Sequence, residues 1–162
     1  MTNEMMTIRK ILIPVDFSPS SKRALNCALV FARKYQSKLF ILACSEGYVI
    51  GPEVIKGHWD SSDQQTHNLL EAIKAQSQKE TEERLSKFLE DAFGEELAGH
   101  ERLVVYGIPY EEIIRAARRL QVDMIILGTM GRTGIERLML GSTAEKVVRL
   151  AHCPVMTVRR EE

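Results

Sequence analysis

Short apolar runs alternate with helical patterns along this sequence, and this alternation limits the folds that the chain can adopt. The five apolar runs are residues 8–15, 39–44, 102–106, 122–127 and 153–158. Continuous apolar runs of this length are typical of strands buried on both faces of a sheet. Strands separated by helices are joined by right-handed crossovers, so the sheet is parallel and carries helices on both faces. The pattern predicts an open α/β fold, Rossmann-like or flavodoxin-like, with strand order 3-2-1-4-5.

Helix signals lie between the apolar runs. Ser18 followed by Pro19 predicts a helix start, because Ser caps the first turn and Pro fits its first position. From Asp63 to Phe93 strong helix formers dominate, and we expect one long helix that projects partly beyond the sheet. Two further helices are expected over residues 110–120 and 144–151. The residues that should pack the first helix on the sheet are Ala24, Leu25, Ala28, Leu29, Ala32 and Tyr35.

Residues 45–62 interrupt the alternation and predict a long irregular loop. The residues that break the pattern are Gly47, Gly51, Pro52, Gly57 and Trp59. Loops of this length in compact domains are often functional, and this one follows the second strand on the side where ligands bind. A lid and a disordered insertion explain the segment equally well. No second domain is indicated, so residues 1–162 are expected to form one domain.

A glycine-rich stretch follows the fourth predicted strand and leads into the last helix. Gly128, Gly131 and Gly134 come first, and Gly141-Ser142-Thr143 closes the stretch. Glycine lets backbone N–H groups approach an anion, and a helix N-terminus adds unpaired donors with a positive partial charge. The stretch therefore favours a nucleotide phosphate site. A tight turn explains it too, because Ser142 and Glu145 could form a capping box instead.

A second feature points to the same place in the fold. In a doubly wound sheet, ligands bind beyond the carboxyl ends of the strands, where the winding direction reverses. In the predicted order the reversal falls between the first and fourth strands, which end at Asp16 and Gly128. Asp16 could accept a hydrogen bond from a ribose hydroxyl or help to hold a divalent metal on phosphates. Its alternative role is an Asx-turn at the helix entry.

The spacing of the glycine stretch resembles a family signature. Gly128, two residues, Gly131, nine residues, Gly141 and then Ser142 resemble the ATP-binding branch of the universal stress protein family. The resemblance extends over nearly the whole chain and includes residues 11–18, 104–113 and 153–158. It implies a single nucleotide-binding α/β domain that dimerises and holds ATP.

The resemblance also implies where a nucleotide would lie. Pro14, Val15 and Asp16 would lie beside the adenosine, and the backbone around Cys44 against the adenine, although the family often has an aliphatic residue there. Magnesium or manganese would accompany the phosphates, with Asp16 as its protein ligand. Arg132 could add a charge-assisted contact to the phosphates or simply be solvated. Met130 is counted among the binding residues, although a role in packing suits it better. The assigned binding residues are Pro14, Val15, Asp16, Cys44, Gly128, Met130, Gly131, Arg132, Gly141, Ser142 and Thr143.

The residue types favour a binding protein over an efficient enzyme. Phosphoryl transfer needs cationic groups on the transferred phosphoryl and a positioned nucleophile. The glycine stretch has no lysine at the phosphate-cradling position, and Asp16 is the one evident base. We therefore expect a nucleotide-dependent regulatory or stress-response module. The alternative is a slow ATP hydrolase or phosphotransferase, while an interaction protein without nucleotide is disfavoured by the intact glycine pattern.

Composition and the last strand bear on partners and location. The chain has 22 basic and 22 acidic residues, so no overall field favours nucleic acid or an anionic membrane. Cys27, Cys44 and Cys153 are scattered in apolar runs. We therefore expect these cysteines to be reduced core residues of a cytoplasmic protein. The last strand lies at the sheet edge, so the chain is expected to form a homodimer through Val155–Val158. Arg159 and Arg160 could instead guard the edge of a monomer.

Overall fold

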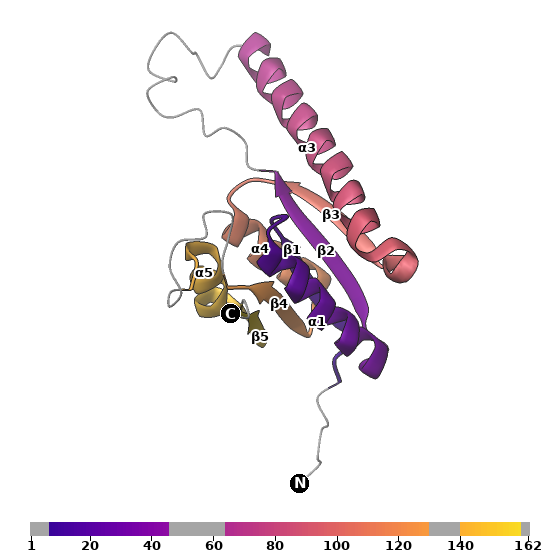
Figure 1. Ribbon diagram of the computed structural model, residues 1–162. Coiled ribbons are helices and arrows are strands. Elements are labelled where there is room, and N and C mark those ends of the chain that lie inside the picture. The colour runs from indigo at the N-terminus through magenta and orange to yellow at the C-terminus, as the bar shows by residue number, and fades with distance from the viewer. Residues whose placement is uncertain (1–6, 46–63, 130–139, 160–162) are drawn as a thin grey trace.

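The sheet has the predicted topology. The computed structural model describes residues 7–45, 64–129 and 140–159, in which five parallel strands lie in the order β3-β2-β1-β4-β5 (Figure 1). The strands are β1 (Lys10–Val15), β2 (Lys38–Ser45), β3 (Glu101–Tyr106), β4 (Met124–Gly128) and β5 (Val155–Val158). The prediction from the alternating pattern is thereby confirmed, and the strand bounds differ from the apolar runs by only a few residues.

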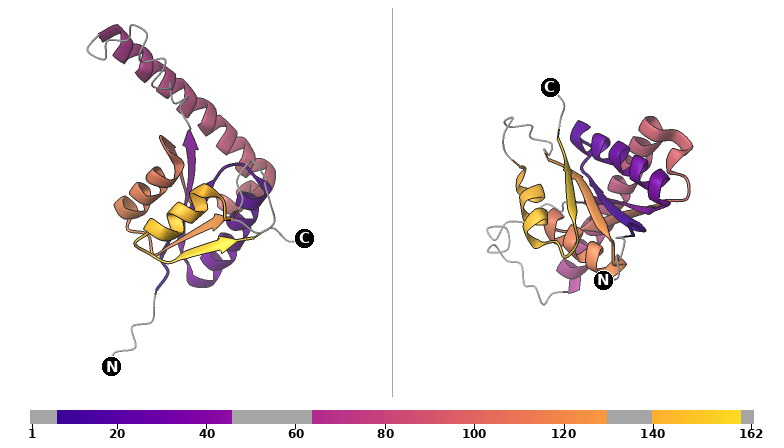
Figure 2. Two further views of the ribbon diagram at one scale, coloured as in Figure 1. Left: turned by 90° about the vertical axis from the view of Figure 1, so that its left-hand side faces the viewer. Right: turned by 90° about the horizontal axis from the view of Figure 1, so that it is seen from below.

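Helices cover both faces of the sheet. On one face lie α1 (Pro19–Tyr35) and α3 (Gln64–Phe93), and on the other lie α4 (Pro109–Leu120) and α5 (Ser142–Leu150) (Figures 1 and 2). A short 3-10 helix, η1 (Gly94–Leu97), follows α3. Alternate residues of each strand point to opposite faces, so β1 contributes Ile11 and Ile13 to one core cluster and Leu12 to the other. Burial on both sides explains why the strands appear in the sequence as continuous apolar runs.

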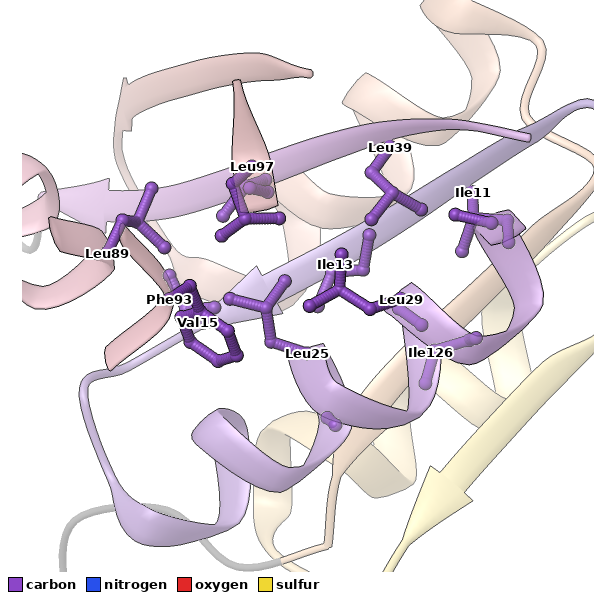
Figure 3. Packing of buried hydrophobic residues seen from close by; sticks show 14 of the residues in the cluster. Ile11, Ile13, Val15, Leu25, Leu29, Leu39, Leu89, Phe93, Leu97 and Ile126 are labelled. Carbon is purple, nitrogen blue, oxygen red and sulfur yellow. The ribbon is translucent and has the colours of Figure 1, made fainter. Parts of the chain in front are cut away.

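The cluster between the sheet and α1 is closely packed. Figure 3 shows Leu25 and Leu29 of α1 against Ile13 of β1 and Ile126 of β4. The predicted inner face of α1 is confirmed for Ala24, Leu25, Ala28, Leu29 and Ala32, all of which are buried. Tyr35 was wrongly expected on this face. It is 44% exposed and stacks on Phe31 and Lys34, because it belongs to the last turn of α1, beyond the buried stripe.

The start of α1 follows the local signals in the sequence. Ser18 is the N-cap, and its Oγ accepts a hydrogen bond from the Ser21 N–H at 3.1 Å. Pro19 occupies the first turn, where its missing N–H costs nothing. At the other end Gln36 adopts the left-handed conformation and donates its N–H to the Ala32 carbonyl. The helix start was predictable because capping depends on neighbouring residues.

The long helix α3 projects beyond the sheet, as expected. Its 30 residues span about 45 Å, which is much longer than the strands beneath it (Figure 2). Leu85 and Leu89 are buried in the core, whereas Leu69, Leu70 and Ile73 near the other end are exposed. The carboxyl half of α3 therefore holds the helix on the domain. The predicted loop at 45–62 falls almost entirely on residues 46–63, outside the described part of the chain.

The three cysteines differ from expectation in one respect. Cys27, Cys44 and Cys153 are only half-buried and do not belong to the fully buried core. Burial raises the pKa of the Cys27 and Cys153 thiols. Within residues 7–45, 64–129 and 140–159, no helix is both long and apolar enough to cross a membrane.

Candidate functional site

The carboxyl ends of β1 and β4 diverge at the predicted reversal of winding. β1 pairs with β4 at Ile11 and Leu12, whereas its pairing with β2 continues to Val15. Pro14 lies where the β4 pairing has stopped, and its lack of an N–H is harmless there. After β1 the chain enters α1 on one face, and after β4 it reaches α5 on the other (Figure 1). The region between these two strand ends, where the reversal of winding predicts a ligand site, is called the crevice.

The Asp16 side chain already takes part in a turn. Its Oδ1 accepts a hydrogen bond from the Ser18 N–H at 3.0 Å, which is the Asx-turn considered as its alternative role. This bond places the carboxylate at the entry to α1 and leaves Oδ2 as the oxygen for any ligand. The Val15 side chain is buried beside Phe93 (Figure 3), so it is not exposed to a ligand.

Gly128 has a packing role that the spacing did not reveal. A Cβ atom at Gly128 would lie 2.4 Å from Ser20 Oγ and 2.8 Å from the Ser20 backbone carbon. The first turn of α1 therefore packs directly on the end of β4, and only glycine allows this approach. Sequence reasoning assigned Gly128 to a phosphate and missed Ser20, because this contact joins segments more than a hundred residues apart.

One backbone hydrogen bond brings the two ends of the glycine stretch together. The Gly141 N–H donates to the Thr129 carbonyl at 2.8 Å, and the Thr129 N–H donates to the Val158 carbonyl at 3.1 Å. Gly128 and Ser142 are thus placed close to each other although 13 residues separate them in the sequence. The Gly141 N–H is engaged in this bond, so it is not a free donor for a phosphate.

The first turn of α5 carries donors that could bind an anion. Gly141 is the N-cap with φ −59° and ψ 151°, no side chain caps the helix, and the Glu145 N–H donates to the Gly141 carbonyl at 2.9 Å. The capping box with Ser142 as the cap is therefore not formed, because the helix begins at Ser142 itself. The N–H groups of Ser142, Thr143 and Ala144 have no acceptor within the helix. Together with the helix dipole and the exposed Ser142 hydroxyl, they fit a phosphate.

Cys44 lies farther along the same edge of the sheet. Val15 pairs with Ala43, so Cys44 is level with Asp16 on the neighbouring strand. Its Sγ donates to the Gly107 carbonyl at 3.2 Å, and the thiol is half-buried. Residue alternation places Pro14 and Cys44 on the face covered by α4 and α5, which is also the face from which α5 begins.

The middle of the glycine stretch, residues 130–139, lies outside the described part of the chain. Met130, Gly131 and Arg132 were predicted to contact the ligand, and all three lie outside the described residues. In the described part of the chain, no three His, Cys, Asp or Glu side chains are grouped to hold a metal.

Comparison with known proteins identifies the family. The profile of the Universal stress protein family matches residues 7–159. Two universal stress proteins of Methanocaldococcus jannaschii, MJ0531 and MJ0577, are each 30% identical to this chain. Each alignment covers 94% of this chain, together with 82% of MJ0531 and 96% of MJ0577.

Solved structures share the fold. Universal stress protein UspA from Lactobacillus plantarum has a TM-score of 0.64 and 26% identity, covering 94% of this chain and 98% of its own. A universal stress protein in complex with cAMP has a TM-score of 0.57 and 22% identity, covering 94% and 98%. The universal stress protein from Archaeoglobus fulgidus in complex with dAMP has a TM-score of 0.53 and 20% identity, covering 95% and 99%. The last two show the fold alone.

The family profile matches most of the chain, and two relatives at 30% identity align with nearly all of it. The strand order β3-β2-β1-β4-β5 agrees with these matches. The chain belongs to the universal stress protein family.

Proposed function

We propose that this protein belongs to the ATP-binding branch of its family and binds ATP with magnesium or manganese in the crevice between β1 and β4. ATP occupancy would set the state of a regulatory or stress-response module. The observation that carries the proposal is the bond between the Gly141 N–H and the Thr129 carbonyl, which joins the two ends of the glycine pattern beside the α5 donors. The cAMP and dAMP complexes add that proteins of this fold bind adenine nucleotides.

Each part of the nucleotide has a candidate partner in this arrangement. The phosphates would lie at the first turn of α5, where Ser142 and Thr143 supply free N–H groups and hydroxyls. Asp16 would use Oδ2 for a ribose hydroxyl or for the metal, since Oδ1 accepts from Ser18. Pro14 and Cys44 lie on the sheet face from which α5 begins, so they suit the adenosine. Gly131 and Arg132 would complete the phosphate site.

The same site gives little support for rapid chemistry. Asp16 is the candidate base at the end of β1, and one of its two carboxylate oxygens is engaged in a turn. We expect ATP turnover far below the roughly 1–100 per second typical of kinases. Multiple turnovers per second by protein free of contaminating ATPase would favour the alternative, a hydrolase or phosphotransferase.

A pair of substitutions at Ser142 tests ATP binding. Ser142→Pro removes both the hydroxyl and the backbone N–H, yet proline suits the first position of a helix, and the extended Gly141 backbone is compatible with a following proline. Ser142→Ala removes the hydroxyl alone. By calorimetry with ATP and Mg²⁺, we expect Ser142→Ala to weaken binding about tenfold and Ser142→Pro about a hundredfold or more, since each hydrogen bond to a charged group contributes about 1.5–3 kcal/mol.

Melting curves of the ligand-free variants control for damage to the fold. Nucleotide that co-purifies with wild-type protein is first identified by mass spectrometry after denaturation. Absence of heat and of any thermal shift at millimolar ATP, in protein shown to be free of nucleotide, would refute the proposed function. Unchanged affinity in Ser142→Pro would place the phosphates elsewhere.

A homodimer through β5 is proposed as the assembled form. β5 is an edge strand, and its bonds to β4 involve the carbonyls of Pro154 and Val158, so the Thr157 N–H faces the open edge. Thr157→Pro removes that donor without removing a bond to β4 and should shift the chain from dimer to monomer in sedimentation experiments. Wild-type protein that sediments near the 18.4 kDa of one chain at micromolar concentration would contradict the dimer.

We also place the protein in the cytoplasm. Among the described residues, Cys27 and Cys153 form no disulfide, which suits a compartment where thiols stay reduced. Immunolocalisation or cell fractionation would check this assignment, and recovery in an oxidising compartment would contradict it.

A further inference from the structure

Phe17 has a backbone conformation that is unusual for its position. Its φ of 66° lies in the left-handed region, where a bulky side chain is a steric outlier. In the described part of the chain, the other non-glycine residues with positive φ are Gln36 and Gln121, which end α1 and α4. A left-handed residue is ordinary at a helix C-terminus. Phe17 instead precedes a helix, so its strain requires a different explanation.

Two side chains of α3 hold the Phe17 ring. Phe88 meets it edge-on, with ring centroids 5.6 Å apart and planes at 81°. The guanidinium carbon of Arg84 lies 4.2 Å from the Phe17 ring centroid, which is close enough for a cation–π interaction. Arg84 and Phe88 are four residues apart and therefore lie on the same face of the helix. The contacts of the ring with Phe88 and Arg84 can offset the strain of the left-handed backbone.

The backbone at Phe17 controls two polar groups beside the crevice. Asp16 precedes it and Ser18 follows it, and the Asp16 Oδ1–Ser18 N–H bond spans Phe17. Ser18 in turn caps α1 through Ser21. If Phe17 relaxed to a negative φ, the Asp16 carboxylate and the start of α1 would both have to move.

Further contacts place α3 along the same edge of the sheet. The Ser77 and Ser45 hydroxyls are 2.5 Å apart at the end of β2. Lys74 Nζ lies 6.0 Å from the centroid of the Tyr106 ring at the end of β3. Together with the contacts to Phe17, these interactions tie α3 to the carboxyl ends of β3, β2 and β1. A change in the position of α3 would therefore reach the crevice directly.

We propose that α3, through Phe88 and Arg84, sets the conformation of the Asp16–Ser18 turn, and that Phe17 is thereby a positioning residue for the nucleotide site. The second half of this inference rests on the proposed function. Phe17 acts through Asp16 and does not itself bind the ligand. Because coupling between two sites is reciprocal, bound nucleotide should in turn stabilise the contacts between α3 and Phe17.

The expected effect follows from populations. If the binding-competent turn is populated only to a fraction f, the apparent dissociation constant rises by 1/f. Losing the aromatic pair and the cation–π contact together should lower f enough to weaken ATP binding about tenfold. Substituting Phe88 or Arg84 alone should give a smaller effect in the same direction.

The first experiment uses ligand-free protein. Amide hydrogen exchange at Ser18 and Ser21, whose N–H groups are bonded in the turn and the cap, should speed up in Phe88→Leu and in Arg84→Gln. Phe31→Leu is the matched control, because Phe31 packs against the same core cluster from α1 and stacks on Tyr35. Equal exchange at these amides in wild type and Phe88→Leu would overturn the inference, whether or not nucleotide binds.

The second experiment measures ATP affinity. Phe17→Gly removes both strain and ring, and it should weaken binding about tenfold, whereas Phe17→Tyr keeps the ring and should retain most of the affinity. A double-mutant cycle of Phe17→Leu with Phe88→Leu should show coupling in affinity that Phe17→Leu with Phe31→Leu lacks. Wild-type affinity in Phe17→Gly would overturn the positioning role. If wild type binds no ATP, the proposed function fails, and the exchange experiment still decides whether α3 controls the turn.

Discussion

Gly128→Ala adds one methyl group where the first turn of α1 packs on the end of β4. The new Cβ would lie 2.4 Å from Ser20 Oγ, 2.9 Å from Ser20 Cβ and 2.8 Å from the Ser20 backbone carbon. A rotamer change could move the hydroxyl, but the other two atoms are fixed to the helix backbone. The first turn of α1 must therefore shift away from β4.

The cost of this shift can be estimated from overpacked cores. Added methyl groups in packed interiors destabilise proteins by about 1–3 kcal/mol. For a chain of 162 residues this corresponds to a fall in melting temperature of about 2–12 °C. Against a typical stability of about 5–15 kcal/mol, the variant should still fold. Because α1 begins beside the Asp16–Ser18 turn, we also expect weaker ATP binding than in wild type.

The assay is urea and thermal denaturation of the ligand-free protein, with two comparison variants. Ser20→Ala should be neutral or slightly stabilising, since Ser20 Oγ is buried without a hydrogen-bond partner among the described residues. In Ser20→Ala/Gly128→Ala the 2.4 Å contact is gone and the backbone contact remains, so only part of the lost stability should return. A melting temperature for Gly128→Ala within 1 °C of wild type would refute the steric reasoning, given the roughly 2 °C minimum shift expected.

Two further predictions concern other sites. Burial, with a smaller contribution from Lys38, lowers the pKa of His100, whose Nδ1 accepts from the Leu39 N–H at 3.2 Å. The stabilising contribution of neutral His100 should therefore be complete above the unfolded pKa of about 6.5 and decline as pH falls below it. The urea midpoints measured at pH 7.5 and pH 5.5 should differ less in His100→Asn than in wild type. An equal difference in the two proteins would contradict this. Gly131→Val should abolish ATP binding but lower the melting temperature of the ligand-free protein only slightly, because a β-branched side chain would block the approach of a phosphate to the backbone. An ATP affinity within a few-fold of wild type would show that the glycine stretch does not bind the phosphates.

Local sequence signals determined much of the fold. Continuous apolar runs predicted five parallel strands because strands buried on both faces need no polar residues. Ser18 and Pro19 predicted the start of α1, since capping involves only adjacent residues. The edge at which the crevice lies followed from strand order, and the glycine spacing indicated the family. These features depend on residues close in sequence or on general rules of connection.

Only the tertiary structure decided which groups at the crevice are available. The sequence spacing could not show that Ser20 packs against Gly128 where a side chain would lie. It also could not show that the Gly141 N–H donates to the Thr129 carbonyl. The left-handed Phe17 carries no local signal, because its ring contacts Arg84 and Phe88, which are more than sixty residues away in the sequence. Backbone strain and close approach depend on contacts between distant segments, and a single sequence does not encode them as a local pattern. The sequence alone therefore predicted a place for the candidate site, and packing decided which of the described groups there are engaged within the protein.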